Sequence, residues 1–332
     1  MMSNRLTELL EEKDVLLADG GMGTSMFAVG LANGAPGELW NMEEPEKIKK
    51  IHQDFVDAGS DIILTNTFGG NLFRCKLHSD EANADPININ GARLAREVAD
   101  AAGRPVIVGG SMGPSGEMLI PLGERPVEDV FEAFKGQAAA LKEGGADVAW
   151  IETMFMDDEL DAAARACDEV GLEYVSTMTF DTGGRTMMGL KPEDAIKLVD
   201  SRDWHPAAFG ANCGIGPAQL IDTILGLSMN NEANRILIAK GNCGLPGFDD
   251  EMKIVYDGTP EIMAAYAIMA RDAGARIIGG CCGTAPQHLA AMRKALDETP
   301  RSNETPTHDM IEEILGPVKV TFEVPKSPGL PG

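Results

Sequence analysis

The sequence lacks long apolar runs and has far fewer basic than acidic residues. Its apolar stretches are no longer than strands, and residues 1–13 are polar and acidic, so we expect no transmembrane helix and no signal peptide. Only 28 Lys and Arg stand against 52 Asp and Glu, a formal charge of -24, which argues against nucleic acid or an anionic membrane as a partner.

Cysteine is sparse as well. Six cysteines in 332 residues are too few for a disulfide scaffold. In a reducing compartment, clustered thiols are more often metal ligands or catalytic groups. We therefore expect a cytoplasmic protein that acts on small molecules.

What the sequence does contain is a repeated alternation of short apolar runs with segments of helical period. Ile48, Ile51, Phe55 and Val56, for example, form one helical stripe. Eight strand–helix units predict an α/β fold, a closed (β/α)8 TIM barrel. An open doubly wound sheet is the alternative, but this chain lacks the glycine pattern expected after the first strand of that fold. The predicted strands are 15–19, 61–67, 105–109, 148–152, 174–180, 207–212, 235–239 and 275–279.

The composition changes near residue 300. Beyond Pro300 the chain is rich in Pro, Ser and Thr, which is typical of a tail that is flexible or draped on a partner subunit. We therefore predict a barrel domain over residues 1–299 and a C-terminal tail over residues 300–332, and we expect a homo-oligomer.

The most informative motif is Gly-Gly-Cys-Cys-Gly-Thr at 279–284, directly after the last predicted strand. Pro286 suits the first turn of a following helix, and the glycines allow the backbone to leave β geometry, so both sulfurs can point to one place. Cys213 follows the sixth strand in the same setting. Three thiolates from two strand ends predict a zinc site with its fourth position open, which is the catalytic arrangement.

Other interpretations of the cysteines stay open. The adjacent pair can form a strained disulfide or pack as two small apolar side chains. Cys243 also follows a predicted strand and is an alternative ligand, and a fourth protein sulfur would make the site structural. Cys75 and Cys167 lie in helical or connecting segments and are predicted to be packing residues.

Two carboxylates, Asp19 and Glu152, follow the first and fourth predicted strands. They are either helix caps or loop anchors, or they bind an ammonium group near the thiolates. The glycines at 20, 21 and 23 expose backbone N–H groups suited to a carboxylate. Together these groups predict an amino-acid pocket. The five histidines have no metal-binding spacing and are interpreted as structural.

Five motifs of the chain share a resemblance: Asp-Gly-Gly-Met-Gly-Thr (19–24), Thr-Asn-Thr-Phe (65–68), Ile-Glu-Thr (151–153), Gly-Ala-Asn-Cys-Gly-Ile-Gly-Pro (210–217) and Gly-Gly-Cys-Cys-Gly-Thr (279–284). They resemble those of the zinc-dependent homocysteine S-methyltransferases. This family includes the betaine–homocysteine enzymes, whose bacterial members are the most similar in type, and the homocysteine half of cobalamin-dependent methionine synthase. The resemblance covers about residues 15–297.

The resemblance implies a (β/α)8 barrel and a reaction that forms methionine from homocysteine. The zinc ligands it implies, which are also the catalytic residues, are Cys213, Cys281 and Cys282. The residues it implies for binding homocysteine are Asp19, Gly20, Gly21, Glu152 and Asn212. Homocysteine sulfur would take the open zinc position, and the anionic site would attract a cationic methyl donor.

The methyl donor is less well defined by the sequence. A quaternary ammonium or sulfonium group favours aromatic faces, and Trp40, Phe68 and Tyr256 are the candidates. Glycine betaine is favoured, with dimethylsulfoniopropionate and S-methylmethionine as further candidates. Animal betaine enzymes have tyrosines where this chain has Gly69 and Thr153, so a betaine pocket here would be built differently. The alternative function is a corrinoid-protein-dependent methyltransferase or demethylation subunit with the same zinc–thiolate chemistry.

Overall fold

The computed structural model describes residues 5–78, 81–248 and 254–318. In these residues, eight parallel strands are hydrogen-bonded in the order β1-β10-β7-β6-β5-β4-β3-β2, and a bridge between Ala18 and Ile62 joins β1 to β2. The sheet therefore closes, and the predicted (β/α)8 TIM barrel is confirmed. The barrel strands are β1 (Leu16–Leu17), β2 (Ile62–Leu64), β3 (Ile107–Met112), β4 (Val148–Met154), β5 (Tyr174–Met178), β6 (Phe209–Cys213), β7 (Leu237–Gly241) and β10 (Ala275–Gly280).

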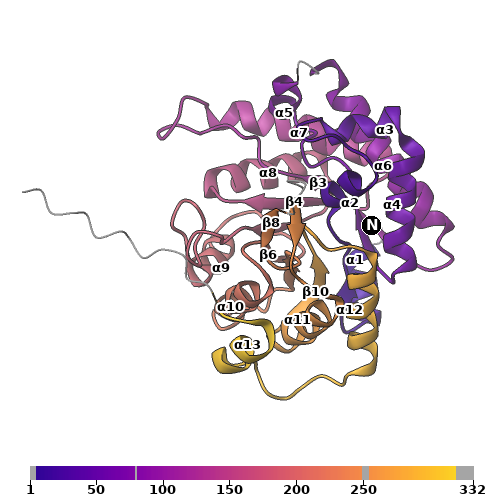
Figure 1. Ribbon diagram of the computed structural model, residues 1–332. Coiled ribbons are helices and arrows are strands. Elements are labelled where there is room, and N and C mark those ends of the chain that lie inside the picture. The colour runs from indigo at the N-terminus through magenta and orange to yellow at the C-terminus, as the bar shows by residue number, and fades with distance from the viewer. Residues whose placement is uncertain (1–4, 79–80, 249–253, 319–332) are drawn as a thin grey trace, which may run out of the picture.

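Helices surround the strands (Figure 1). Their buried faces follow the predicted periodicity: Ile48, Ile51, Phe55 and Val56 all face the core from one helix. Pro286 begins another helix, as predicted. None of the helices in the described part of the chain is long and apolar enough to cross a membrane. The helices are α1 (Arg5–Glu12), α2 (Met22–Ala28), α3 (Trp40–Glu43), α4 (Pro45–Asp57), α5 (Leu72–Leu77), α6 (Ala84–Ala101), α7 (Val127–Gly144), α8 (Asp157–Val170), α9 (Pro192–Asp200), α10 (Pro217–Ser228), α11 (Pro260–Asp272), α12 (Pro286–Glu298) and α13 (His308–Leu315).

The hydrophobic core has two layers. The larger layer lies between the strands and the surrounding helices. The smaller one fills the barrel interior, where Trp150 is fully buried, and Leu6, Leu9 and Leu10 of α1 join it. Because these leucines come from the segment before β1, α1 closes the N-terminal end of the barrel, and the C-terminal end is left for the site.

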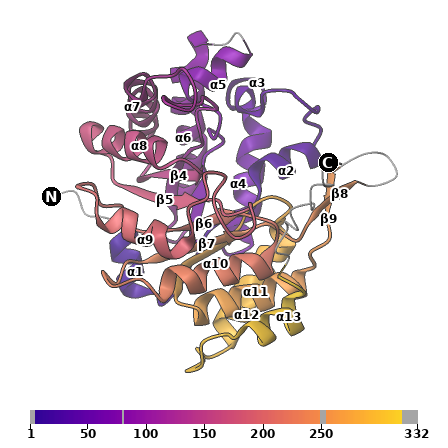
Figure 2. The same ribbon diagram turned by 90° about the vertical axis from the view of Figure 1, so that its left-hand side faces the viewer.

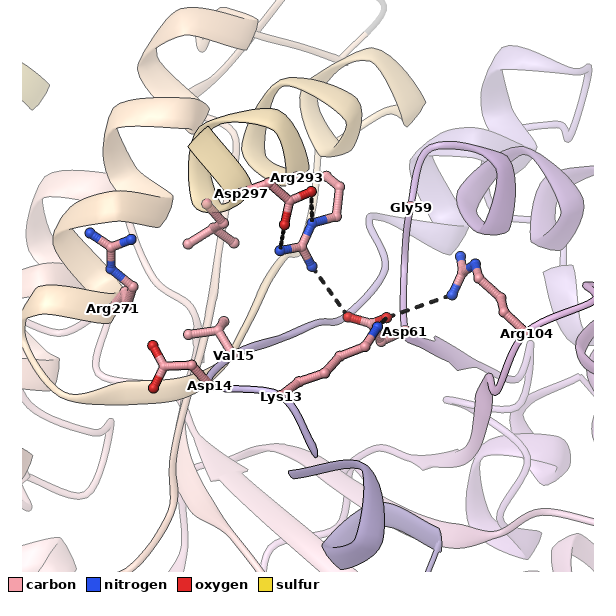
Figure 3. Close-up of a pocket in the computed structure, with 10 residues that line it drawn as sticks. Lys13, Asp14, Val15, Gly59, Asp61, Arg104, Arg271, Arg293 and Asp297 are labelled. Carbon is pink, nitrogen blue, oxygen red and sulfur yellow. Dashed lines mark hydrogen bonds and ion pairs between the residues drawn. The ribbon is translucent and has the colours of Figure 1, made fainter. Parts of the chain in front are cut away.

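The seam between β1 and β2 is held by two buried carboxylates as well as by the single bridge. Asp61 precedes β2 and its Oδ2 accepts the N–H of Leu17 (2.9 Å), whereas Asp19 follows β1 and its Oδ2 accepts the N–H of Leu64 (2.7 Å). Each side chain thus replaces a ladder hydrogen bond that these two short strands do not make. Figure 3 shows Arg104 and Arg293 directed at Asp61 from opposite sides.

Two features were not predicted. A hairpin of β8 (Pro246–Phe248) and β9 (Ile254–Tyr256) follows β7 and projects from the barrel (Figure 2). Within the segment assigned to the tail, α13 packs against α10 and α11 with Ile311 buried, and His308 Nε2 lies 3.2 Å from Asp222 Oδ1. Residues 319–332 of that segment lie outside the described residues.

Candidate metal centre

A cavity of about 270 Å³ opens at the C-terminal ends of the barrel strands. Its walls come from the loops after β1 and β2, from α2, and from the ends of β3, β4, β6, β7 and β10. The three predicted zinc ligands, Cys213, Cys281 and Cys282, all line it, together with Glu152. The cavity therefore brings the predicted thiol cluster together with Glu152, the carboxylate side chain predicted to bind the substrate.

The three cysteines form one compact cluster. Their sulfurs all lie within 4.8 Å of one another, and the Cys213 and Cys281 sulfurs are 3.0 Å apart. Strand β7 separates β6 from β10, as expected, and the strand register aligns Cys213 with Gly241 and Gly241 with Gly280. Because two glycines occupy the intervening positions, no side chain from them stands between the cysteines.

The backbone around the cluster leaves regular β geometry. Cys213 has a φ of 58°, a left-handed conformation that L-residues adopt only when the surroundings enforce it. Asn242 supplies such surroundings, since its side chain accepts the N–H of Cys282 (3.0 Å) and donates to the carbonyl of Gly214 (2.7 Å). One amide thus ties the two cysteine loops together. The sequence prediction missed this role, because Asn242 lies in a loop with no spacing relation to either cysteine.

Hydrogen bonds among the three thiols shift their pKa values. The pKa of Cys282 is lowered because the thiols of Cys213 and Cys281 donate hydrogen bonds to its sulfur. The pKa of Cys213 is raised, first by its hydrogen bond with Cys281 and then by its hydrogen bond with Cys282. One sulfur is therefore stabilised as a thiolate by two thiol protons, and a divalent metal would displace those protons on binding.

The donor set fits zinc. Two sulfurs each about 2.3 Å from a tetrahedral ion are ~3.8 Å apart, which is within the spread of this cluster. In the part of the chain that the structure describes, these cysteines are the one group of three or more side chains with metal-ligating geometry. Cys243 is not in the group: its thiol is buried and donates to the carbonyl of Gly258 (3.4 Å).

Glu152 lies on β4 at an irregularity in the pairing with β5, between Ile151 and Met154. The next residue, Thr153, has a φ of 64°, so the backbone turns Glu152 towards the cavity. Ser111 Oγ donates to Glu152 Oε1 (2.6 Å). Burial raises the pKa of Glu152 to about 7, the cysteine cluster reinforces the rise, and the Lys240 ammonium opposes it.

Asp19 is fully buried and does not line the cavity. Its Oδ2 accepts the N–H of Leu64, and its Oδ1 accepts Lys240 Nζ at 2.6 Å. Lys240 comes from β7 and does line the cavity. The sequence prediction assigned no role to Lys240, since nothing in the chain indicates that residues 221 positions apart form an ion pair.

Asn212 is also buried, and it contacts residues of the cavity wall without lining the cavity itself. Its Oδ1 accepts the N–H of Thr153 (2.8 Å) and Thr177 Oγ1 (2.7 Å), while its Nδ2 donates to Thr153 Oγ1 (2.7 Å). These bonds hold Thr153 in its left-handed conformation, and the Nδ2 also lies 3.9 Å from Cys281 Sγ. The structure thus places Asn212 behind the cavity wall, bonded to protein groups.

The glycine loop that the resemblance assigns to homocysteine lines the cavity, with both Gly20 and Gly21 in its wall. The Gly21 N–H donates to the carbonyl of Thr284 (3.0 Å). A Cβ on Gly20 would lie 2.2 Å from the same carbonyl oxygen, so this loop requires glycine to lie against the turn after the cysteines.

The three candidate aromatic residues have different surroundings. Phe68 lines the cavity. Tyr256 lies over the turn after the cysteines, where a Cβ on Gly283 would be 2.2 Å from its Cγ. Lys47 Nζ lies over the ring of Trp40, 4.5 Å from its centre. Glu38, which was not predicted, lines the cavity and accepts the N–H of Gly69 (2.7 Å).

Comparisons with known proteins agree with this geometry. The sequence profile of a family described as homocysteine S-methyltransferase matches residues 16–296. The metallated form of the homocysteine methyltransferase MmuM from Escherichia coli is 25% identical, with 87% of this chain and 99% of that chain covered and a TM-score of 0.74. Its oxidized form is 24% identical, with 88% and 99% covered and a TM-score of 0.75. Pyruvate carboxylase from Rhizobium etli, at 15% identity over 94% of this chain and 28% of that one, shares the fold, with a TM-score of 0.53.

Proposed function

Since the chain belongs to the homocysteine S-methyltransferase family, we propose that it transfers a methyl group from a small cationic donor to the sulfur of L-homocysteine, forming methionine. The observation that carries this proposal is the cluster of Cys213, Cys281 and Cys282 facing the same cavity as Glu152. A methyl acceptor with a thiol at one end and an ammonium at the other matches that pair of features.

We propose Zn2+ as the metal and the three cysteines as its ligands. An all-sulfur donor set favours zinc over magnesium or calcium, and three protein ligands leave one tetrahedral position free. The similarity to the metallated form of a homocysteine methyltransferase supports a bound metal. A free thiol has a pKa near ~8.5, and the bound metal would keep a coordinated substrate thiol deprotonated and nucleophilic at neutral pH.

The protein's own groups position the substrate. Glu152 accepts the substrate ammonium, and Ser111 fixes the carboxylate by donating to its Oε1. Asn212 holds the backbone of Thr153 beside it. With the amino end fixed, the sulfur is restricted to the neighbourhood of the cysteines, which lowers the entropic cost of the bimolecular step. No general base is required, because the substrate reacts as a thiolate.

The charges around the cavity favour a cationic donor. Of the described residues that line it, Glu38, Glu152 and the cysteine cluster are acidic, while Lys240 is the one basic side chain. Phe68, in the cavity wall, offers an aromatic face to a methylated cation, and Tyr256 lies nearby over the turn after the cysteines. We favour glycine betaine, with dimethylsulfoniopropionate and S-methylmethionine as further candidates. In the transfer, the sulfur–methyl bond forms as the donor's nitrogen–methyl or sulfur–methyl bond breaks, and the donor leaves without its positive charge.

The test is a donor comparison. Purified protein supplied with Zn2+ and L-homocysteine is incubated with each of the three donors, and methionine is measured by mass spectrometry. We expect methionine with at least one donor and a matching amount of demethylated product. Labelled methyl groups should appear in methionine. The absence of methionine with every donor, from folded protein that retains zinc, would contradict the proposal.

A further inference from the structure

A second cavity lies at the end of the barrel away from the cysteines, beside the segment that precedes β1 (Figure 3). Its volume of about 500 Å³ is within the range of small-molecule pockets. Among the described residues of its wall, basic side chains exceed acidic ones, although the whole chain has a formal charge of -24. The charged residues of the wall are Lys13, Arg104, Arg271 and Arg293, with Asp14, Asp61 and Asp297.

The arginines of this wall are held in place by contacts with the protein. Arg104 Nη2 donates to two backbone carbonyls near the end of α4, at 2.8 Å each. The aliphatic part of Arg293 lies against Gly59, where a Cβ would be 2.7 Å from the Arg293 Cγ, and its Nε donates to Asp297 (3.0 Å). Because these side chains are already ordered, a ligand that binds them would lose little affinity to side-chain ordering.

The cations also keep hydrogen-bonding capacity that the protein does not use. Figure 3 shows Lys13, Arg104 and Arg293 directed at Asp61, whose Oδ2 already accepts the N–H of Leu17. Lys13 Nζ donates one proton to Asp61 Oδ1 (2.6 Å) and has two more to donate. Arg104 Nη1 lies 3.6 Å from the same oxygen and has no hydrogen-bond partner among the described residues. One buried carboxylate thus leaves these three cations able to bind a further anion.

The donors in this cavity suit a phosphate group. A planar guanidinium matches the spacing of phosphate oxygens, and a lysine ammonium binds phosphate as a point charge. The negative charge of the whole chain opposes a long polyanion such as nucleic acid, so the ligand should be small. Val15 and Leu296 add apolar surface to the same wall, so an organic part of a ligand also finds contacts there.

We propose that this cavity binds a phosphate group through Lys13, Arg104 and Arg293, either as inorganic phosphate or as the phosphate of a small phosphorylated molecule. The site is separate from the cavity that contains the cysteines. The inference therefore does not rest on the proposed methyl transfer, and either can fail without the other.

The test uses AMP, adenosine and inorganic phosphate as probes. Their affinities for the full-length protein are measured by titration calorimetry in a phosphate-free buffer of low ionic strength. We expect AMP or inorganic phosphate to bind at least about tenfold more tightly than adenosine, since hydrogen bonds to a charged group contribute that much. Tighter binding of AMP than of inorganic phosphate would identify a phosphorylated molecule as the ligand, and the reverse order would identify free phosphate.

Two variants with opposite expected effects locate the binding. Lys13→Met removes a cation that is 41% exposed, and the affinity for the phosphate probe should fall about tenfold. Asp297→Asn removes a 60% exposed carboxylate that occupies Arg293, and the affinity should rise by about threefold. Lys135→Met is the matched control, because Lys135 is 35% exposed and pairs with Glu169 on the outer helices, and it should leave the affinity unchanged.

Three results would overturn the inference. The first is that neither AMP nor inorganic phosphate binds more tightly than adenosine. The second is that Lys13→Met and Asp297→Asn both keep the wild-type affinity or both lose it, as a purely structural role of these charges requires. The third is an equal loss in Lys135→Met. If Lys13→Met does not fold, the gain of affinity in Asp297→Asn still decides the question.

Discussion

At the two ends of the barrel seam, Asp61 and Asp19 make the same backbone contact in opposite surroundings. Asp61, at the N-terminal end, lies 2.6 Å from Lys13, 3.4 Å from Arg293 and 3.6 Å from Arg104. These cations are 41%, 22% and 33% exposed and border a cavity of about 500 Å³ (Figure 3). At the other end, Asp19 has one cation, Lys240, and both are almost fully buried.

The difference lies in the local charge balance. At the N-terminal end three cations exceed one buried carboxylate. Two of the three are bonded to other protein groups as well: Arg104 to the carbonyls of Val56 and Ser60, and Arg293 to Asp297. At the C-terminal end, Lys240 faces Asp19, Glu152 and the thiol cluster, so negative groups exceed positive ones in a buried space. A buried excess of negative charge lowers the stability of the fold unless cations bind there. A divalent metal and a substrate ammonium would supply them.

The largest effect should come from the thiol cluster. Cys281→Ala removes one of three predicted ligands, and we expect loss of zinc retention together with a fall in turnover of at least ~1000-fold, because the loaded metal supplies the thiolate. Zinc content by mass spectrometry and methionine formation are measured on the same sample. Cys243→Ala is the matched control and should keep both. Full activity in Cys281→Ala, or zinc loss in Cys243→Ala, would contradict the ligand assignment.

The next effect tests the opposite end of the seam. Asp61→Asn leaves three cations without their buried carboxylate, and we expect the free energy of unfolding to fall by about 2–3 kcal/mol, with the partial exposure of the cations limiting the loss. Urea denaturation measures it. The kcat/KM for homocysteine should stay within about twofold, because Asp61 lies at the end of the barrel away from the cysteines.

The control for this prediction is Asp14→Asn. Asp14 is 65% exposed and pairs with Arg301, so its loss should cost less than about 1 kcal/mol. If Asp61→Asn is no more destabilising than Asp14→Asn, the buried Asp61 carboxylate does not stabilise the fold through its three cations.

The smallest effect is a pH dependence at the C-terminal end. The pKa of Glu152 is raised to about 7, mainly by burial, so the carboxylate becomes protonated as pH falls below that value and no longer attracts the substrate ammonium. The KM for homocysteine should therefore rise about tenfold per pH unit below pH 7. Glu152→Gln should have a high KM that does not change over this range. A wild-type KM that is constant between pH 5.5 and 8 would exclude this role.

The same pKa shift predicts the sign of a stability change. The pKa of Glu152 is higher in the folded protein than in the unfolded chain, so folding favours its protonated form. Its cost to stability is absent below the unfolded pKa near 4.5 and grows as pH rises to about 7. Substrate-free Glu152→Gln should therefore melt at a higher temperature than wild type at pH 8, and at nearly the same temperature at pH 4.5.

The barrel was predictable because its strands are buried on both faces and read as continuous apolar runs. All eight predicted segments overlap with barrel strands of the structure. The β8–β9 hairpin was missed, since its short antiparallel strands lie outside the strand–helix alternation on which the prediction was based. The meeting of Cys213 with Cys281 and Cys282 was predictable for a related reason: in a closed parallel barrel, residues that follow strands meet at one end.

The sequence by itself determined the barrel and the three thiols that meet at one end of it. Only the tertiary structure decided how individual side chains are used there. Asp19 turns to Lys240 instead of the cavity, and Asn212 turns to Thr153. The physical reason is that side-chain direction beyond a strand end depends on register, bulges and left-handed residues such as Thr153 and Cys213. Contacts with distant segments set these features, and no local pattern records them.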